Sequence, residues 1–146
     1  LLGAFAQPAG EGMVLTHQAT IDRLFTGAAV EDILAALDAE AASNGTHAAF
    51  AARTAALMRT KSPTSLKLVR EQMRRGATLD FAQCMRTEFR IVSRIVEGHD
   101  FYEGVRAVIV DKDNEPRWQP AELAEVGDAD VERHFASLGE AELVLP

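Results

Sequence analysis

The chain has 146 residues, 47% of them hydrophobic, and a formal net charge of −7. Its size suits one hydrophobic core, and its negative charge argues against a general nucleic-acid binder, because attraction to phosphates requires a basic surface. No run approaches the roughly eighteen apolar residues of a membrane span, and the first residues lack the basic lead-in of a secretory signal. Because the chain does not begin with Met, we expect it to be a piece of a longer protein.

The charge is unevenly distributed along the chain. Residues 53–94 carry ten basic and three acidic side chains, whereas residues 95–146 carry four basic and thirteen acidic ones. One interpretation is that basic middle helices pack beside an acidic tail. The other is a basic face for an anion such as a CoA phosphate.

The single cysteine and the four histidines do not indicate a reactive or metal-binding site. Cys84 lies in a helical pattern, has no cysteine to pair with, and is predicted to be a small buried apolar residue of a protein in a reducing compartment. That compartment would be the cytoplasm, or the mitochondrial matrix in a eukaryote. His17, His47, His99 and His134 are far apart along the chain, so no metal site is predicted.

The first half of the chain reads as a linker followed by short helices. Residues 1–16 contain several Gly and Pro residues and are predicted to be a linker from a missing upstream catalytic core. Apolar residues then recur at helical spacing over 17–25, from about 30 to 41, and over 46–59.

Two longer helices are predicted in the middle of the chain. Ser62 caps a helix that begins at Pro63, a position where the missing proline N–H costs nothing, and Gly76 ends it. Thr78 is expected to cap the next helix, over about 79–97. The apolar residues that we expect to face inward on these two helices are Leu66, Val69 and Met73, and then Phe81, Ala82, Met85, Phe89, Val92, Ile95 and Val96.

Together these patterns predict an all-α fold of about six to seven helices, with residues 17–146 forming one helical C-terminal domain. A last helix is expected to start at Asp128 or Asp130. Val108–Val110 could be a short extended segment, because three apolar residues do not separate helix from strand.

The segment from Gly98 to Trp118 has the pattern of a helix start followed by a charged turn. Gly98 can adopt the left-handed turn that ends one helix, and Asp100 and Glu103 have the spacing of a capping box. Capping and solvent exposure explain the carboxylates of this segment, so no acid/base catalyst is assigned to them. Ser62 is likewise explained as a helix cap, because no nucleophile-elbow or phosphate-loop pattern occurs.

The residue types of this segment resemble the C-terminal signature of the crotonase (enoyl-CoA hydratase/isomerase) superfamily. Glu103-Gly104-x-x-Ala107 precedes the charged cluster Asp111-Lys112-Asp113, and Pro116-x-Trp118 follows. The fuller form, which begins at His99-Asp100-Phe101-Tyr102, resembles the 3-hydroxyisobutyryl-CoA hydrolase branch, as do residues 61–67 and the ending from Asp130. The resemblance extends from about Ile21 to the end of the chain.

The resemblance implies an acyl-CoA thioester hydrolase of valine breakdown whose catalytic groups lie outside this chain. The oxyanion-hole amides and the acids that activate water belong to a preceding α/β core, so no catalytic residue is expected here and this chain alone should be inactive. Lys112 is the candidate contact to CoA phosphates, and a solvent-facing turn residue is the alternative. The expected structural residues of the signature are Asp100, Phe101, Glu103, Gly104, Pro116 and Trp118.

The implied partners are the upstream core, in the same chain or in another subunit, and an acyl-CoA substrate, with no metal, nucleic acid or membrane. A homo-oligomer is compatible with this reading. Two alternatives stay open: the same region of an enoyl-CoA hydratase or isomerase, and a non-catalytic helical module that binds a protein partner.

Overall fold

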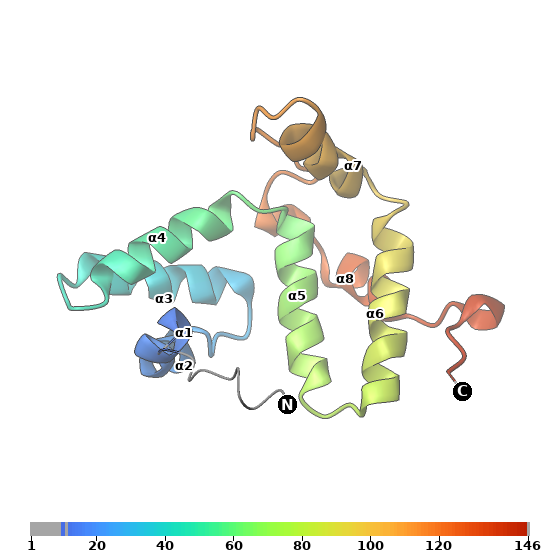
Figure 1. Cartoon of the computed structure of the whole chain (residues 1–146), viewed down its shortest axis with the longest axis horizontal. Coiled ribbons are helices and arrows are strands. Elements are labelled where there is room, and N and C mark those ends of the chain that lie inside the picture. The colour runs from blue at the N-terminus through green and yellow to red at the C-terminus, as the bar shows by residue number, and fades with distance from the viewer. Residues whose placement is uncertain (1–9, 11, 146) are drawn as a thin grey trace, which may run out of the picture. The chain divides into compact units, whose positions relative to one another are not determined.

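The computed structural model describes Gly10 and residues 12–145, and within them it is all-α: eight α-helices and no strand (Figure 1). The fold class is therefore confirmed. The helices are α1 (Met13–Thr16), α2 (Gln18–Leu24), α3 (Val30–Ala42), α4 (Ala48–Arg59), α5 (Pro63–Gly76), α6 (Phe81–Ile95), α7 (His99–Val105) and α8 (Asp128–Phe135). None of the helices in the described residues has the length and apolar character needed to span a bilayer.

The chain divides into two compact units, residues 1–56 and 57–146, so the single domain expected over 17–146 remains a prediction. Most of the predicted linker lies outside the described residues, and its last part contains α1. In the first unit, α3 buries Val30, Ile33, Leu34 and Leu37. Gly27 precedes this helix in a confined place, since a Cβ there would lie 2.7 Å from the Cβ of Asp32.

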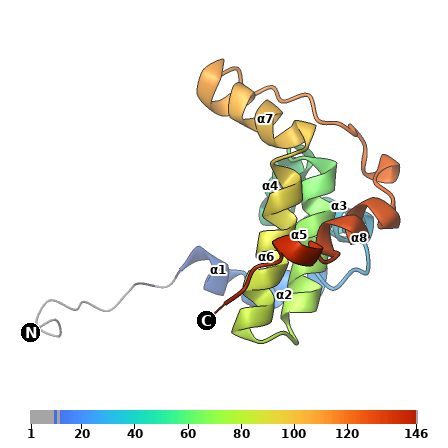
Figure 2. The same cartoon turned by 90° about the vertical axis from the view of Figure 1, so that its right-hand side faces the viewer.

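The second unit is built on α5 and α6, which run in opposite directions, with α8 packed against both (Figures 1 and 2). Its core consists of Leu68, Ile91 and Phe135, with Ile95 and Val131 packed against them. Each of the three helices contributes an apolar side chain to this core, so α8 is what joins α5 to α6.

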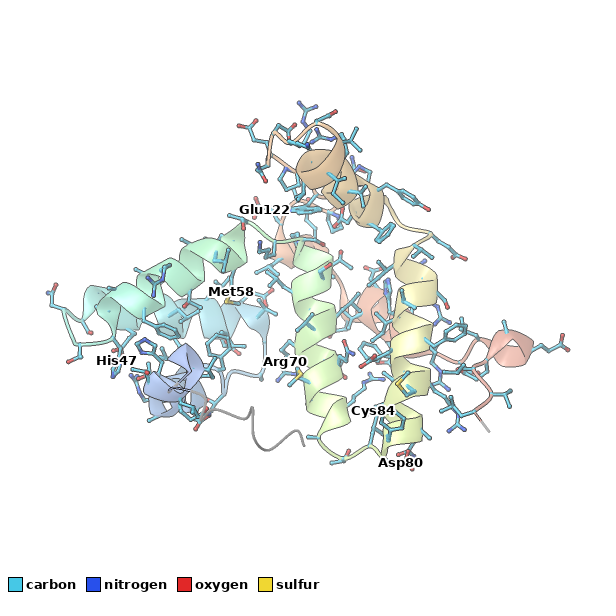
Figure 3. The ribbon with its side chains drawn as sticks, viewed as in Figure 1. His47, Met58, Arg70, Asp80, Cys84 and Glu122 are labelled. Carbon is cyan, nitrogen blue, oxygen red and sulfur yellow. The ribbon has the colours of Figure 1, made fainter. Side chains whose placement is uncertain are left out.

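The apolar residues predicted to face inward on α5 and α6 mostly face solvent within this chain, so that prediction is wrong. Val69 and Met73 are 57% and 73% exposed, and Phe81 and Val92 are 79% and 49% exposed. The physical reason is that α8 covers a different face of both helices, the one that carries Leu68 and Ile91. Cys84 is half-buried on α6 rather than fully buried (Figure 3).

The basic middle helices do pack beside the acidic tail, as the first interpretation of the charge pattern predicted. Arg75 forms an ion pair with Glu132 of α8, and Arg90 Nε lies 2.7 Å from Glu142 Oε2. Arg94 donates to the carbonyl of His134, in the last turn of α8, and to that of Ser137, just after the helix. The arginines of α5 and α6 thus fasten the C-terminal residues to the helix pair.

Two local expectations at helix ends were wrong. Asp80, not Thr78, caps α6, and its carboxylate accepts from Gln83 N at 2.8 Å. The segment Val108–Val110 is not extended, because α7 continues into a single π-helical turn, Arg106–Val110, in which Asp111 N donates to Arg106 O at 2.8 Å. The cap at Ser62 is confirmed, with Ser65 N donating to its Oγ at 3.1 Å.

Candidate functional site

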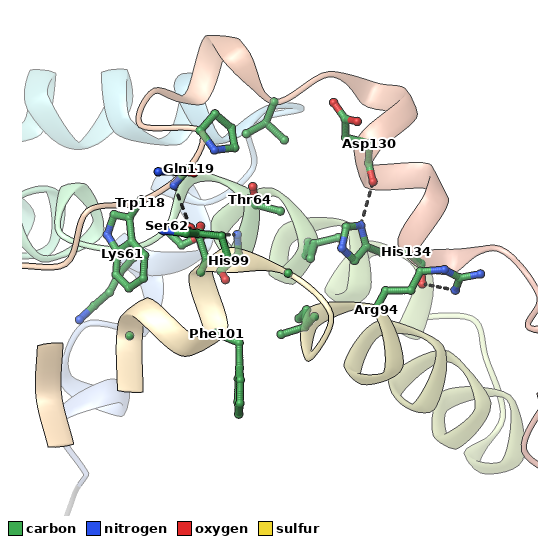
Figure 4. A pocket seen from close by; sticks show the side chains of 18 of the residues that line it. Lys61, Ser62, Thr64, Arg94, His99, Phe101, Trp118, Gln119, Asp130 and His134 are labelled. Carbon is green, nitrogen blue, oxygen red and sulfur yellow. Dashed lines mark hydrogen bonds and ion pairs between the residues drawn. The ribbon is translucent and has the colours of Figure 1, made fainter. Parts of the chain in front are cut away.

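The signature segment from Gly98 to Trp118 borders a hollow of about 740 Å³ in the second unit (Figure 4). Parts of α5, α6, α7 and α8 line it, together with the chain around Gln119. Its apolar lining includes Leu68, Ile95, Phe101, Val105, Val108, Ile109 and Trp118, and its polar lining includes Lys61, Ser62, Arg94, His99, Arg133 and His134.

Asp100 is the junction of three stretches of chain. Its Oδ2 accepts from Ser62 Oγ at 2.6 Å, and its Oδ1 accepts from Gln119 N at 2.8 Å. Ser62, buried at the start of α5, therefore caps that helix and also holds α7. The expected capping box is wrong, because Asp100 uses its oxygens for these distant donors and α7 has no side-chain cap. Gly98, which precedes α7, has φ −91° and so does not adopt the expected left-handed conformation.

Glu103 also reaches beyond its own helix. It accepts from Arg106 Nε and Nη2 at 2.9 and 2.8 Å, and from Arg117 N at 2.7 Å. The pKa of Glu103 is lowered to about 2, mainly by the bidentate contact with Arg106 and to a smaller extent by the bond from the Arg117 amide. Glu103 thus stays ionised at neutral pH and holds the chain at Arg117, after the turn, against α7.

Arg106 is the central residue of the turn, and sequence reasoning missed it. Besides Glu103, its Nη1 donates to Asp111 Oδ2 at 2.7 Å and to Asp113 Oδ2 at 2.6 Å, and its Nη2 donates to Glu115 O at 3.2 Å. These carboxylates raise the pKa of Arg106 further above its ordinary value. The signal in the sequence was an arginine three residues after Glu103 and shortly before two aspartates.

Lys112 lies at the tip of the turn and has φ 57°, a left-handed conformation that residues with a Cβ rarely adopt. Its neighbours Asp111 and Asp113 both form ion pairs with Arg106, whereas the exposed Lys112 ammonium makes no ion pair within residues 12–145. Retaining a lysine here costs about 1–2 kcal/mol in backbone strain.

Trp118 packs against the signature helix and bonds to the chain before α5. Its Nε1 donates to Thr60 O at 3.0 Å, and its ring covers Gly104, where a Cβ would lie 3.4 Å from Cη2. Phe101 differs, since it is 43% exposed and contacts Tyr102 edge-on at 5.3 Å between ring centroids. Pro116 is half-buried ahead of the tryptophan. The segment is therefore fixed from within, while Phe101 is partly exposed at the edge of the hollow.

His99 and His134 differ in what their rings can do. His99 lies beside Asp100, with Nδ1 3.1 Å from Oδ1, and is partly exposed. His134 is buried, and its Nδ1 donates to Asp130 O at 2.8 Å (Figure 4). Neither ring forms an acid/base relay with a serine, because the Ser62 hydroxyl donates to Asp100 directly.

A family model described as "Enoyl-CoA hydratase/isomerase" matches residues 2–135. The chain therefore belongs to the enoyl-CoA hydratase/isomerase family, and the match begins inside the predicted linker.

Within that family, the chain is similar to mitochondrial 3-hydroxyisobutyryl-CoA hydrolases. It is 42% identical to the one from Danio rerio over 125 residues, which are 86% of this chain and 31% of that protein. It is 37% identical to the one from Homo sapiens over 127 residues, 87% of this chain and 31% of that protein. The chain thus spans about a third of the length of these relatives.

Two solved structures share its fold, and they are named for reactions other than hydrolysis. A carnitinyl-CoA dehydratase from Mycobacterium thermoresistibile has a TM-score of 0.84 and 38% identity, covering 98% of this chain and 39% of that one. An enoyl-CoA hydratase from Rhodobacter sphaeroides 2.4.1 has a TM-score of 0.78 and 33% identity, covering 98% of this chain and 42% of that one. This helical region therefore accompanies more than one reaction on CoA thioesters.

Proposed function

We propose that this chain is the helical C-terminal region of a 3-hydroxyisobutyryl-CoA hydrolase-like enzyme, and that it braces the CoA and acyl site of a catalytic core outside the chain. The observation that carries the proposal is the signature turn, which Arg106 and Glu103 hold rigid while Lys112 projects from it. The similarity to hydrolases over most of the chain supports the reaction type. In a eukaryote the protein would work in the mitochondrial matrix, as the names of these relatives suggest.

In this proposal, Lys112 contacts a CoA phosphate and contributes binding rather than chemistry. Because a hydrogen bond to a charged group contributes about 1.5–3 kcal/mol, Lys112→Ala should raise the KM for the acyl-CoA by roughly tenfold or more with kcat little changed. Arg53→Ala, which removes the same charge from an exposed position of the first unit, is the matched control. Equal KM values for the two variants would exclude the role of Lys112.

The bracing role rests on the apolar stripe of α6, defined as Phe81, Phe89, Val92 and Val96, all of them at least 36% exposed. We expect the catalytic core, of the same chain or of another subunit, to cover this stripe, since burial of such apolar area favours association. Size-exclusion chromatography of this chain with a separately expressed core should show a complex. Val92→Asp should abolish the complex and Val144→Asp, on the exposed C-terminal tail, should not.

The reaction itself is tested on the full-length protein. Incubation with 3-hydroxyisobutyryl-CoA should release free CoA, measured as a new thiol. A specific alternative is an enoyl-CoA hydratase or isomerase, favoured by the dehydratase and hydratase among the similar structures. In that case no thiol appears and an enoyl-CoA substrate is consumed instead. A protein without either activity that still binds a partner would be the non-catalytic module, and no turnover is expected from this chain alone.

A further inference from the structure

The fold joins two histidines that lie 30 residues apart in the first unit. His17 lies between α1 and α2, and His47 directly precedes α4. Their Nδ1 atoms are 3.3 Å apart, and their rings meet edge-to-face with centroids 5.5 Å apart. Both side chains are half-buried. Nothing in the proposed CoA chemistry of the second unit uses this pair.

A stacked ring packs on His17, and backbone hydrogen bonds position both histidines. Phe50, on the first turn of α4, stacks on His17 with centroids 4.2 Å apart and the planes inclined by 18°. The backbone is also fixed: His17 O accepts from Thr20 N, and His47 O accepts from Ala51 N, each at 2.9 Å. The backbone at both histidines is thus positioned in advance, which lowers the entropic cost of bringing the two rings together around a ligand.

The contact limits the protonation states of the pair. A neutral imidazole has one N–H, so one ring donates Nδ1–H and the other accepts it through the Nδ1 lone pair. A further proton on the accepting Nδ1 would leave two N–H groups facing each other. At least one Nδ1 of the pair therefore carries a free lone pair in this contact, and an unprotonated ring nitrogen is what a metal ion binds.

The spacing fits one tetrahedral ion. Zinc–imidazole bonds are about 2.0–2.1 Å long, so an ion bound to two nitrogens 3.3 Å apart would have an N–Zn–N angle of about 104–111°, close to tetrahedral. To aim both lone pairs at the ion, each ring must turn by about 35–40°, which the broad χ2 torsion of histidine allows.

We propose that His17 and His47 form a two-histidine binding site for a borderline divalent cation of the zinc class. Both rings bind through Nδ1. When both rings are neutral, the proton shared in the free pair moves, through solvent, to Nε2 of the ring that carried it, and no net proton is lost; a ring that is also protonated on Nε2 releases one proton to solvent. Water completes the coordination, since the described residues include no group of three or more His, Cys, Asp or Glu placed around a metal ion. Imidazole ligands suit Zn²⁺, Ni²⁺ and Cu²⁺ and disfavour Mg²⁺ and Ca²⁺.

The test is titration of the protein with Zn²⁺ by calorimetry, with His17→Gln and His47→Gln as variants and His99→Gln as the matched control from the second unit. We expect one site per chain, weakened at least about tenfold by either variant and unchanged in the control, because even outer-shell changes at metal sites cost about 10–100-fold. Mg²⁺ should not compete. Equal affinities in all four proteins, or no binding by the unmodified protein, would overturn the proposal.

A second measurement guards against variants that merely fail to fold. In the unmodified protein, ¹⁵N spectra of the histidine rings should show the Nδ1 signals of His17 and His47 shifting with Zn²⁺ while those of His99 and His134 stay in place. Shifts confined to the latter two would refute the site.

Discussion

Replacing Gly104 with alanine tests how closely the signature helix packs against Trp118. Gly104 is one of the signature residues, yet its backbone is helical and the helix continues beyond it into the π-turn. A Cβ at this position would lie 3.4 and 3.6 Å from Trp118 Cη2 and Cζ3, which is ordinary van der Waals contact. Alanine should therefore fit without displacing the ring.

The expected change in the free energy of unfolding has two contributions. Alanine is more favourable than glycine inside a helix by about 1 kcal/mol, and each new carbon contact adds only about 0.1–0.2 kcal/mol. We expect Gly104→Ala to stabilise the second unit by about 0.5–1 kcal/mol, which corresponds to a rise in Tm of roughly 2–8 °C for a unit of this size. Urea unfolding followed by the fluorescence of Trp118, the only tryptophan, measures this change directly.

Gly104→Val is the matched comparison. Its two γ-carbons extend toward the indole and should destabilise the unit by about 1–3 kcal/mol through overpacking. A loss of about 1 kcal/mol or more in the alanine variant would refute the reasoning, since it would mean that the indole leaves no room for a methyl group. If the full-length alanine variant is stable but turns over acyl-CoA poorly, the glycine is needed for a close approach by a group outside this chain.

Three further predictions concern single interactions. Gly27→Ala should destabilise the first unit by about 1–3 kcal/mol, because its Cβ would lie 2.7 Å from an atom of the following helix; chemical unfolding followed by circular dichroism measures this. Trp118→Phe removes the bond to Thr60 O and should lower stability by about 1 kcal/mol, whereas an unchanged urea midpoint would show that the bond contributes nothing. The pKa of Glu103 is lowered from 4.5 to about 2. Its contribution to stability is therefore present above about pH 4.5 and is lost as the pH falls toward 2. Over this pH range the Tm of Glu103→Gln should fall less steeply than that of the unmodified protein.

Features that depend on neighbours along the chain could be predicted from sequence. The cap at Ser62, with Pro63 in the first turn, was predicted correctly because its donors and acceptors are a few residues apart. The all-α class followed from the spacing of apolar residues, which reports local helical geometry. The family resemblance was also readable from the residue types between Glu103 and Trp118.

Features that depend on partners distant in sequence were decided only by the tertiary structure. Asp100 and Glu103 have the spacing of a capping box, but their oxygens accept from Ser62 Oγ and Arg117 N instead. Helical periodicity identified an apolar face on α6, but only the position of α8 decides that Ile91 is buried.

The same division holds for the histidines and for the turn around Arg106. Separation along the chain argued against a joint role for His17 and His47, yet the packing of the first unit places their nitrogens 3.3 Å apart. Arg106 drew no attention as one charge among many, and the π-turn then brought three carboxylates to its guanidinium. Sequence thus determined which segments are helical and which family they belong to, because short-range geometry and residue identity carry that information. Which side chains meet depends on how the helices pack, and contacts across 30 residues leave no periodic signal in the chain.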